Sequence, residues 1–224
     1  MLPRGHRDDR HSSRSRARAA RTGRPEKDSI RLSAIRQLAN GLDEGNQHED
    51  RLEFLKAQLD TDIRLGASET DILDTKANLA ICYSRLQQHD ESLALRREVY
   101  AKGVALGRQG DDILIDALNL SASLRIVGLN AKAKSFLRVQ LPKARRELGA
   151  EHDTVIRLRA LYARLLGIDD DEASRDNLVE AVANLEELDA LTQRVYGTGH
   201  PVTARNQRDL EKTRSKLASF DAPC

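Results

Sequence analysis

The sequence repeats itself with a period of 41 to 42 residues. A shift of 41 places Asn78 on Asn119. The dipeptide Leu-Gly recurs at 65–66, 106–107 and 148–149. A unit of this length cannot bury its apolar residues alone, so neighbouring units must stack on one another. The repeat therefore limits the chain to a solenoid-like fold.

Apolar residues follow helical spacing from residue 29 onward. Two such stripes are Ile30, Ala34, Leu38 and Leu42, and Leu52, Leu55, Leu59 and Ile63. Steps of three and four residues place each stripe on one side of a helix. The polar segment 41–48 between the stripes is short, so the two helices are expected to form an antiparallel hairpin. Aromatic residues make up only 3% of the chain, which disfavours a β-sandwich.

We therefore expect an all-α solenoid of four helical hairpins and a capping helix. The hairpins are predicted at about 29–68, 69–110, 111–152 and 153–199, and the capping helix at 201–218. The acidic stretch 169–175 lengthens the turn of the fourth hairpin. Residues 1–28 are rich in Arg, Ser, Gly and Pro and are expected to be a disordered basic tail, and residues 219–224 a flexible C-terminus.

Several short motifs recur along the chain. They are Thr75, Asn78-Leu79-Ala80 and Tyr83; Glu91-Ser92-Leu93; Thr154 and Tyr162; Gly149-Ala150-Glu151-His152; and Gly197-Thr198-Gly199-His200-Pro201. Over residues 69–217 this pattern resembles the tetratricopeptide repeats of the kinesin light chain type. The third hairpin departs from it, because Asp116 and Leu124 replace the Thr and the Tyr. The resemblance implies a tetratricopeptide-type α-solenoid, with armadillo and HEAT repeats as alternative folds of similar period.

The resemblance is incomplete ahead of the repeats. A kinesin light chain carries a long heptad region there, through which it joins the heavy chain. Residues 29–65 are too short for such a region and are interrupted by Gly41 and Gly45. A kinesin heavy chain is therefore not an expected partner.

The resemblance also implies where a partner would bind. In such solenoids the first helix of each hairpin lines a concave groove, and Asn78 and Asn119 hold the position that often donates hydrogen bonds to a bound peptide backbone. Arg157 is expected at the equivalent place in the next hairpin. Seven residues further on, Arg85 and Arg164 would lie on nearly the same face. A groove lined by Asn and Arg suits an extended peptide with carboxylates, although each residue could be an ordinary exposed one. We expect a protein–protein interaction scaffold with a protein or peptide partner.

No catalytic or metal-binding pattern is recognisable in the sequence. The six histidines include no i, i+4 pair, and none lies near a cysteine. His152 and His200 are expected to cap helix ends, and the tyrosines to pack between helices. The acidic run 169–172 lacks the ligand spacing and glycine of a calcium loop, so we expect a solvated turn that caps the next helix. Neither an enzymatic activity nor a cofactor or metal is expected.

Charge is distributed unevenly along the chain. Residues 1–25 hold eight arginines against Asp8 and Asp9, a net charge of +6, which leaves −4 for the rest of a chain whose total is +2. Such a tail could bind RNA or another polyanion, which is the alternative function.

The compartment follows from two further features of the sequence. No run of about 18 apolar residues exists, so no membrane contact is expected. Cys82 and Cys224 lie far apart and fit two reduced thiols. The cytoplasm is the expected compartment, with the nucleus or an organelle as the alternative through the basic tail.

Overall fold

The structure is a computed structural model that describes residues 48–170 and 173–221. The chain divides into two units, residues 1–55 and 56–224, which are described separately. In the first unit, the described residues form the start of helix α3. The predicted tail, and the first helix of the first predicted hairpin, lie outside the described residues.

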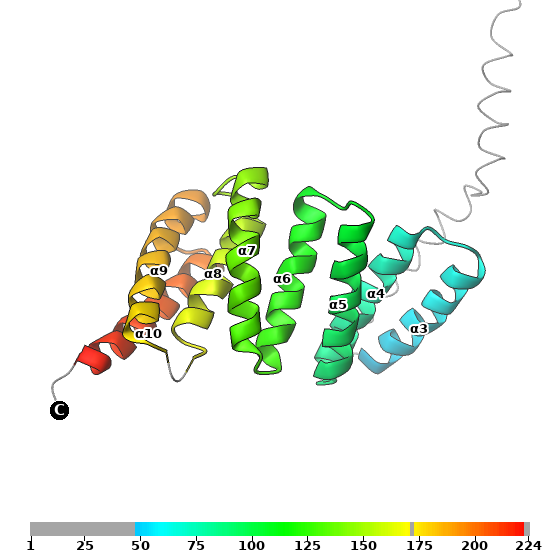
Figure 1. Cartoon of the computed structure of the whole chain (residues 1–224), viewed down its shortest axis with the longest axis horizontal. Helices are drawn as coiled ribbons and strands as arrows, with labels where there is room; N and C mark the ends of the chain where they lie inside the picture. Colours follow the sequence, from blue (N-terminus) through cyan, green and yellow to red (C-terminus); the bar gives the residue numbers. More distant parts are fainter. Residues whose placement is uncertain (1–47, 171–172, 222–224) are drawn as a thin grey trace, which may run out of the picture. The chain divides into compact units, whose positions relative to one another are not determined.

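Every regular element of the described residues is an α-helix (Figure 1). The helices are α3 (His48–Arg64), α4 (Glu69–Arg85), α5 (His89–Ala105), α6 (Gly110–Ile126), α7 (Asn130–Leu148), α8 (Asp153–Leu166), α9 (Arg175–Tyr196) and α10 (Pro201–Asp221). The predicted all-helical fold is confirmed. Helix α10 continues three residues past the expected end at 218, and its Asp221 accepts a hydrogen bond of 2.7 Å from Arg175.

Helices of the second unit pack in chain order. From α4 to α10 each helix lies against its successor, and α6 also packs against α8 (Figure 1). Helix α3 is tied to α4 by the Thr75 hydroxyl, which donates to the Asp62 carboxylate at 3.1 Å. In the predicted division into hairpins, α4, α6 and α8 are the first helices and α5, α7 and α9 the second helices.

Glycines explain why the Leu-Gly dipeptide recurs. Gly66, Gly107 and Gly149 follow the ends of α3, α5 and α7 with φ values of 65°, 72° and 84°. This left-handed conformation reverses the chain after a helix and strains any residue with a Cβ atom.

The two turn histidines cap the helices that follow them. The His152 Nδ1 atom accepts a hydrogen bond of 3.3 Å from the Thr154 amide, and His200 Nδ1 accepts one of 3.3 Å from the Val202 amide. Each ring satisfies an amide that has no partner within its own helix. The predicted capping role is confirmed.

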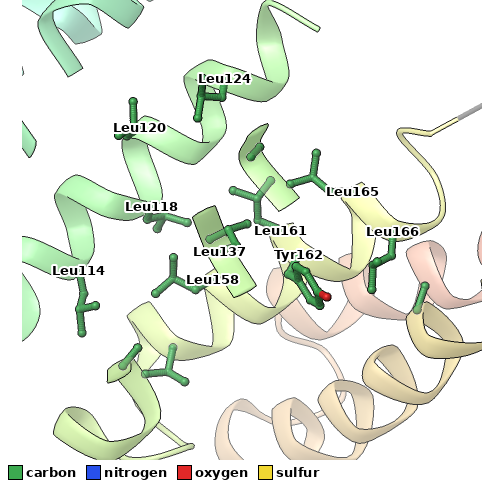
Figure 2. Close-up of a cluster of buried hydrophobic side chains, with 14 of the residues drawn as sticks. Leu114, Leu118, Leu120, Leu124, Leu137, Leu158, Leu161, Tyr162, Leu165 and Leu166 are labelled. Atoms are coloured by element: carbon green, nitrogen blue, oxygen red, sulfur yellow. The ribbon is translucent and has the colours of Figure 1, made fainter. Parts of the chain in front are cut away.

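Leucines of α6, α7 and α8 form the main core (Figure 2). The labelled members are Leu114, Leu118, Leu120, Leu124, Leu137, Leu158, Leu161, Tyr162, Leu165 and Leu166. Leu124, which departs from the repeat pattern, is only 6% exposed and belongs to this core. The replacement of Tyr by Leu therefore keeps an apolar side chain where the fold needs one.

Gly167, after the end of α8, is predicted to tolerate no side chain. A Cβ atom there would lie 2.9 Å from Thr213 Cγ2 of α10 and 3.3 Å from Ala181 Cβ of α9. Gly167→Ala should lower the free energy of unfolding by about 2 kcal/mol, because an added methyl group must push packed helices apart. Urea denaturation measures this loss.

A second substitution tests the cause of that loss. Thr213→Ser removes the clashing methyl group and keeps the hydroxyl that donates to the Asp209 carbonyl at 2.7 Å. The double variant should regain at least half of the lost stability. A double variant no more stable than Gly167→Ala would show that this contact is not the cause.

Candidate partner-binding face

Asn78 and Asn119 occupy the same place in successive first helices. Each is the tenth residue of its helix, in α4 and α6 respectively. Both are half-buried, and neither amide is hydrogen-bonded to another described residue. An amide group offers two donors and an acceptor, which together can pair with a peptide backbone. These two amides form the centre of the candidate site.

Apolar side chains flank Asn119 on α6. Ile115 and Ile126 are 38% and 43% exposed. They lie four residues before and seven residues after Asn119, so all three share one side of the helix. The repeat could have identified both isoleucines as unusual, because a shift of 41 aligns these apolar residues with the polar Asp74 and Arg85. We call the side of α4, α6 and α8 that carries Asn78, Asn119 and Arg157 the first-helix face.

Arg157 is exposed, and a shift of 38 places it on Asn119. It is the fifth residue of α8, and the tenth is the buried Tyr162. Helix α8 starts later in the repeat than α6, because a shift of 38 places the buried Leu120 and Leu124 of α6 on the buried Leu158 and Tyr162 of α8. This burial pattern agrees with the expected equivalence of Arg157 and Asn119. The side chain of Arg157 is 54% exposed, and its ion pair with Asp153 has an N–O distance of 3.6 Å.

Arg164 is held inside the fold. Its Nη1 atom donates to both carboxylate oxygens of Asp209 in α10, at 3.0 and 2.9 Å. Its Nε atom lies 3.5 Å from Asp169. Only 20% of the Arg164 side chain and 6% of the Asp209 side chain are exposed. Because these contacts occupy the guanidinium group, we leave Arg164 out of the first-helix face.

Arg85 and Arg164 differ in exposure, although they lie seven residues after Asn78 and Arg157 respectively. Arg85 is exposed at the last position of α4, whereas Arg164 is half-buried in α8. Tyr83 and Tyr162 lie five residues after Asn78 and Arg157. The Tyr162 hydroxyl donates to Glu180 at 3.0 Å and accepts from Arg138 at 3.3 Å, which agrees with the predicted packing role. Burial raises the pKa of Tyr162.

The structure adds an ion-pair network around Arg108. Its guanidinium group donates to Asp116 at 3.2 Å, to Asp74 at 2.7 Å and to the Thr70 carbonyl at 3.1 Å. Burial raises the pKa of Asp116, and Arg108 opposes that rise. Asp116, which departs from the repeat pattern, therefore has a structural role between α5 and α6. Residue spacing gives no signal for this contact, because Arg108 lies in a turn.

The first two residues of the acidic run, Asp169 and Asp170, are anchored rather than solvated. Asp169 and Asp170 are half-buried. Their contacts are Asp169 with Arg125 at 3.5 Å, Asp170 with Lys134 at 2.7 Å, and the Asp169 carbonyl with Asn130 at 2.6 Å. Ser174 caps α9, so the prediction that the acidic run does so is wrong.

Neither a metal-binding cluster nor a membrane-spanning helix occurs among the described residues. No group of three or more His, Cys, Asp or Glu side chains in residues 48–170 and 173–221 is placed to hold a metal ion. No helix in the same part of the chain is long and apolar enough to cross a membrane.

Comparison with known proteins shows the fold. No protein-family model matches the sequence, and no curated protein matches it. One crystal structure of nearly identical TPR-like repeats of a Podosopora anserina putative kinesin light chain has a TM-score of 0.69 and 20% identity, over 84% of this chain and 87% of that one. Another crystal structure of such repeats has a TM-score of 0.65 and 19% identity, over 86% and 98%. BtubC (BKLC) from P. vanneervenii has a TM-score of 0.59 and 15% identity, over 96% and 91%. The predicted tetratricopeptide-type repeat fold is confirmed.

Proposed function

We propose that this chain, which has the fold of kinesin light chain-like repeats, is a protein-interaction scaffold that binds an extended acidic peptide on its first-helix face. The observation that carries the proposal is the pair Asn78 and Asn119, whose half-buried amides form no hydrogen bond with other described residues. A repeat fold presents such amides at a regular interval, and an extended peptide presents its backbone groups in the same way.

The side chains around these amides define the class of peptide. Ile115 and Ile126 offer exposed apolar surface to an apolar residue of the partner. The exposed ion pair of Arg157 with Asp153 is weak, so the guanidinium group can bind a carboxylate of the peptide instead. The expected ligand therefore combines a carboxylate with at least one apolar side chain.

Selection from a library of random peptides displayed on phage tests the proposal. We expect the full chain to select peptides enriched in Asp and Glu, and Arg157→Glu to lose that enrichment. A selected peptide should bind Asn78→Leu/Asn119→Leu about ten- to thirtyfold more weakly, since each lost hydrogen bond contributes about 1 kcal/mol. Fluorescence anisotropy measures the affinity.

A matched substitution controls for the change of an amide to an apolar group. Asn184 of α9 is half-buried and donates to the Glu180 carbonyl of its own helix at 3.0 Å. Asn184→Leu should leave the affinity within about twofold, below the effect of one lost hydrogen bond. If the Asn78→Leu/Asn119→Leu variant is folded by circular dichroism and binds as tightly as the wild type, the first-helix face is not the binding site.

The alternative function rests on another part of the chain. Binding of RNA or another polyanion depends on residues 1–25, which lie outside the described residues, and stays a prediction. The cytoplasmic compartment stays a prediction as well.

A further inference from the structure

Helix α7 differs in charge from the other second helices. It contains six Lys or Arg residues and one acidic residue, Glu147. Helix α5 has three basic and three acidic residues, and α9 has two basic and five acidic residues. The strong positive charge is therefore a property of α7 and is not shared by α5 and α9, which are also second helices.

Three of these cations lie along one outward side of α7. Lys143 and Arg146 follow Lys132 by eleven and fourteen residues, close to three and four helical turns. All three are exposed, and none forms an ion pair with another described residue. Val139, two turns after Lys132, is 55% exposed between them. We call Lys132, Val139, Lys143 and Arg146 the α7 stripe, which is about 21 Å long at 1.5 Å per residue.

The fold does not account for Lys132. Lys134 pairs with Asp170 at 2.7 Å, and Arg138 donates to the Tyr162 hydroxyl at 3.3 Å. Arg146 lies in the last turn of α7, where a cation stabilises the helix dipole. Lys132 lies near the start of α7, where a cation is unfavourable, and the first turn contains no acidic residue. A residue that opposes its own helix is expected where a surface serves binding.

We propose that the α7 stripe is a second docking surface, which binds an acidic amphipathic helix of a partner protein. Acidic side chains spaced by whole turns would pair with Lys132, Lys143 and Arg146, and an apolar side chain between them would cover Val139. The stripe contains no aromatic side chain on which a base could stack, and its centre is apolar, so a protein fits better than a nucleic acid. The chain's own residues 1–25, with a net charge of +6, would be repelled.

A synthetic probe tests the α7 stripe with the full chain. The probe is a helical peptide with glutamates spaced by whole turns around one leucine, and its affinity is measured by fluorescence anisotropy. Lys132→Glu/Lys143→Glu/Arg146→Glu should weaken binding at least about tenfold, because three attractive pairs become repulsive. Val139→Asp should weaken binding of the probe further than that of a polyglutamate peptide.

A matched variant separates the stripe from net charge. Arg205, Arg208 and Lys212 are exposed cations of α10, and their replacement by Glu changes the net charge by the same amount. This control should keep the affinity within about threefold, since distant charges are screened by salt. If one triple variant fails to fold, Lys143→Glu is compared with Lys212→Glu.

Three results would overturn the proposal. The first is an equal loss of affinity for the probe in both triple variants, and the second is no binding of the probe to the wild type. The third is that a polyuridine RNA binds the wild type more tightly than the probe does, with an affinity that Val139→Asp leaves unchanged. A peptide that binds the first-helix face should still bind the variant Lys132→Glu/Lys143→Glu/Arg146→Glu. The test of the α7 stripe can therefore fail while the proposed function holds, and the reverse is also true.

Discussion

Asp209→Ala is expected to lower the free energy of unfolding by about 3 kcal/mol, as for other broken buried ion pairs. The substitution removes the carboxylate that accepts both hydrogen bonds of Arg164 Nη1. The guanidinium group would then stay largely buried with only Asp169, at 3.5 Å, as a charged partner. Because Arg164 belongs to α8 and Asp209 to α10, the loss should appear first as exposure of α10. Amide hydrogen exchange and urea denaturation measure these two effects.

A neighbouring acid provides the control. Glu211 lies on the same helix and is exposed. Glu211→Ala removes the same charge without breaking a buried pair, so stability should change by no more than about 0.5 kcal/mol. Equal effects of the two substitutions would show that the Arg164–Asp209 pair does not hold α10 in place.

Leu158→Ala is expected to destabilise the core by about 3 to 4 kcal/mol. Leu158 has no exposed surface and belongs to the cluster shared by α6, α7 and α8 (Figure 2). Its truncation removes apolar contacts and leaves a cavity that packed helices fill only in part. In a repeat fold each unit is stabilised by its neighbours, so α8 should lose hydrogen-exchange protection together with α6 and α7.

An exposed aliphatic residue provides the comparison. Val104 of α5 is 52% exposed, and Val104→Ala exchanges a β-branched residue for a better helix former. Its effect should lie within about 0.5 kcal/mol of zero. A loss for Leu158→Ala that is no larger than the loss for Val104→Ala would contradict the described core.

The Arg164–Asp209 pair also decides which variants can test binding. Arg164→Glu would place a second acid against the buried Asp209, so loss of a partner could follow from loss of structure. Arg157→Glu avoids this problem, because the side chain is 54% exposed and its only ion pair among the described residues is exposed as well. The charge-reversal experiment on the first-helix face therefore uses Arg157 alone.

Local features of the fold could be predicted from local sequence. Apolar spacing predicted helices, and the turn residues His152 and His200 were expected to cap helix ends. Each of these depends on contacts within a few residues, such as an amide and the ring two positions before it. The amides of Asn78 and Asn119 could be paired in the same way, because a constant shift of 41 carries one helix onto the next.

The start of α8 could not be predicted with the same rule. Helix α8 has 14 residues, whereas α4 and α6 each have 17, and it begins closer to the residues that the repeat matches. Coincident residue types mark the repeat but do not mark the residue at which a helix begins. The repeat placed Arg157 with Asn119, and the buried residues of α6 and α8 agree with that shift.

The all-helical class and the period near 41 can be derived from the residues alone, because they depend on composition and on neighbours along the chain. Packing between helices sets other features: Arg164 pairs with Asp209, cations of other helices anchor Asp169 and Asp170, and Arg157 stays exposed. Arg164 and Asp209 are 45 residues apart. A contact at that separation depends on how helices pack, which the spacing within any one helix does not specify.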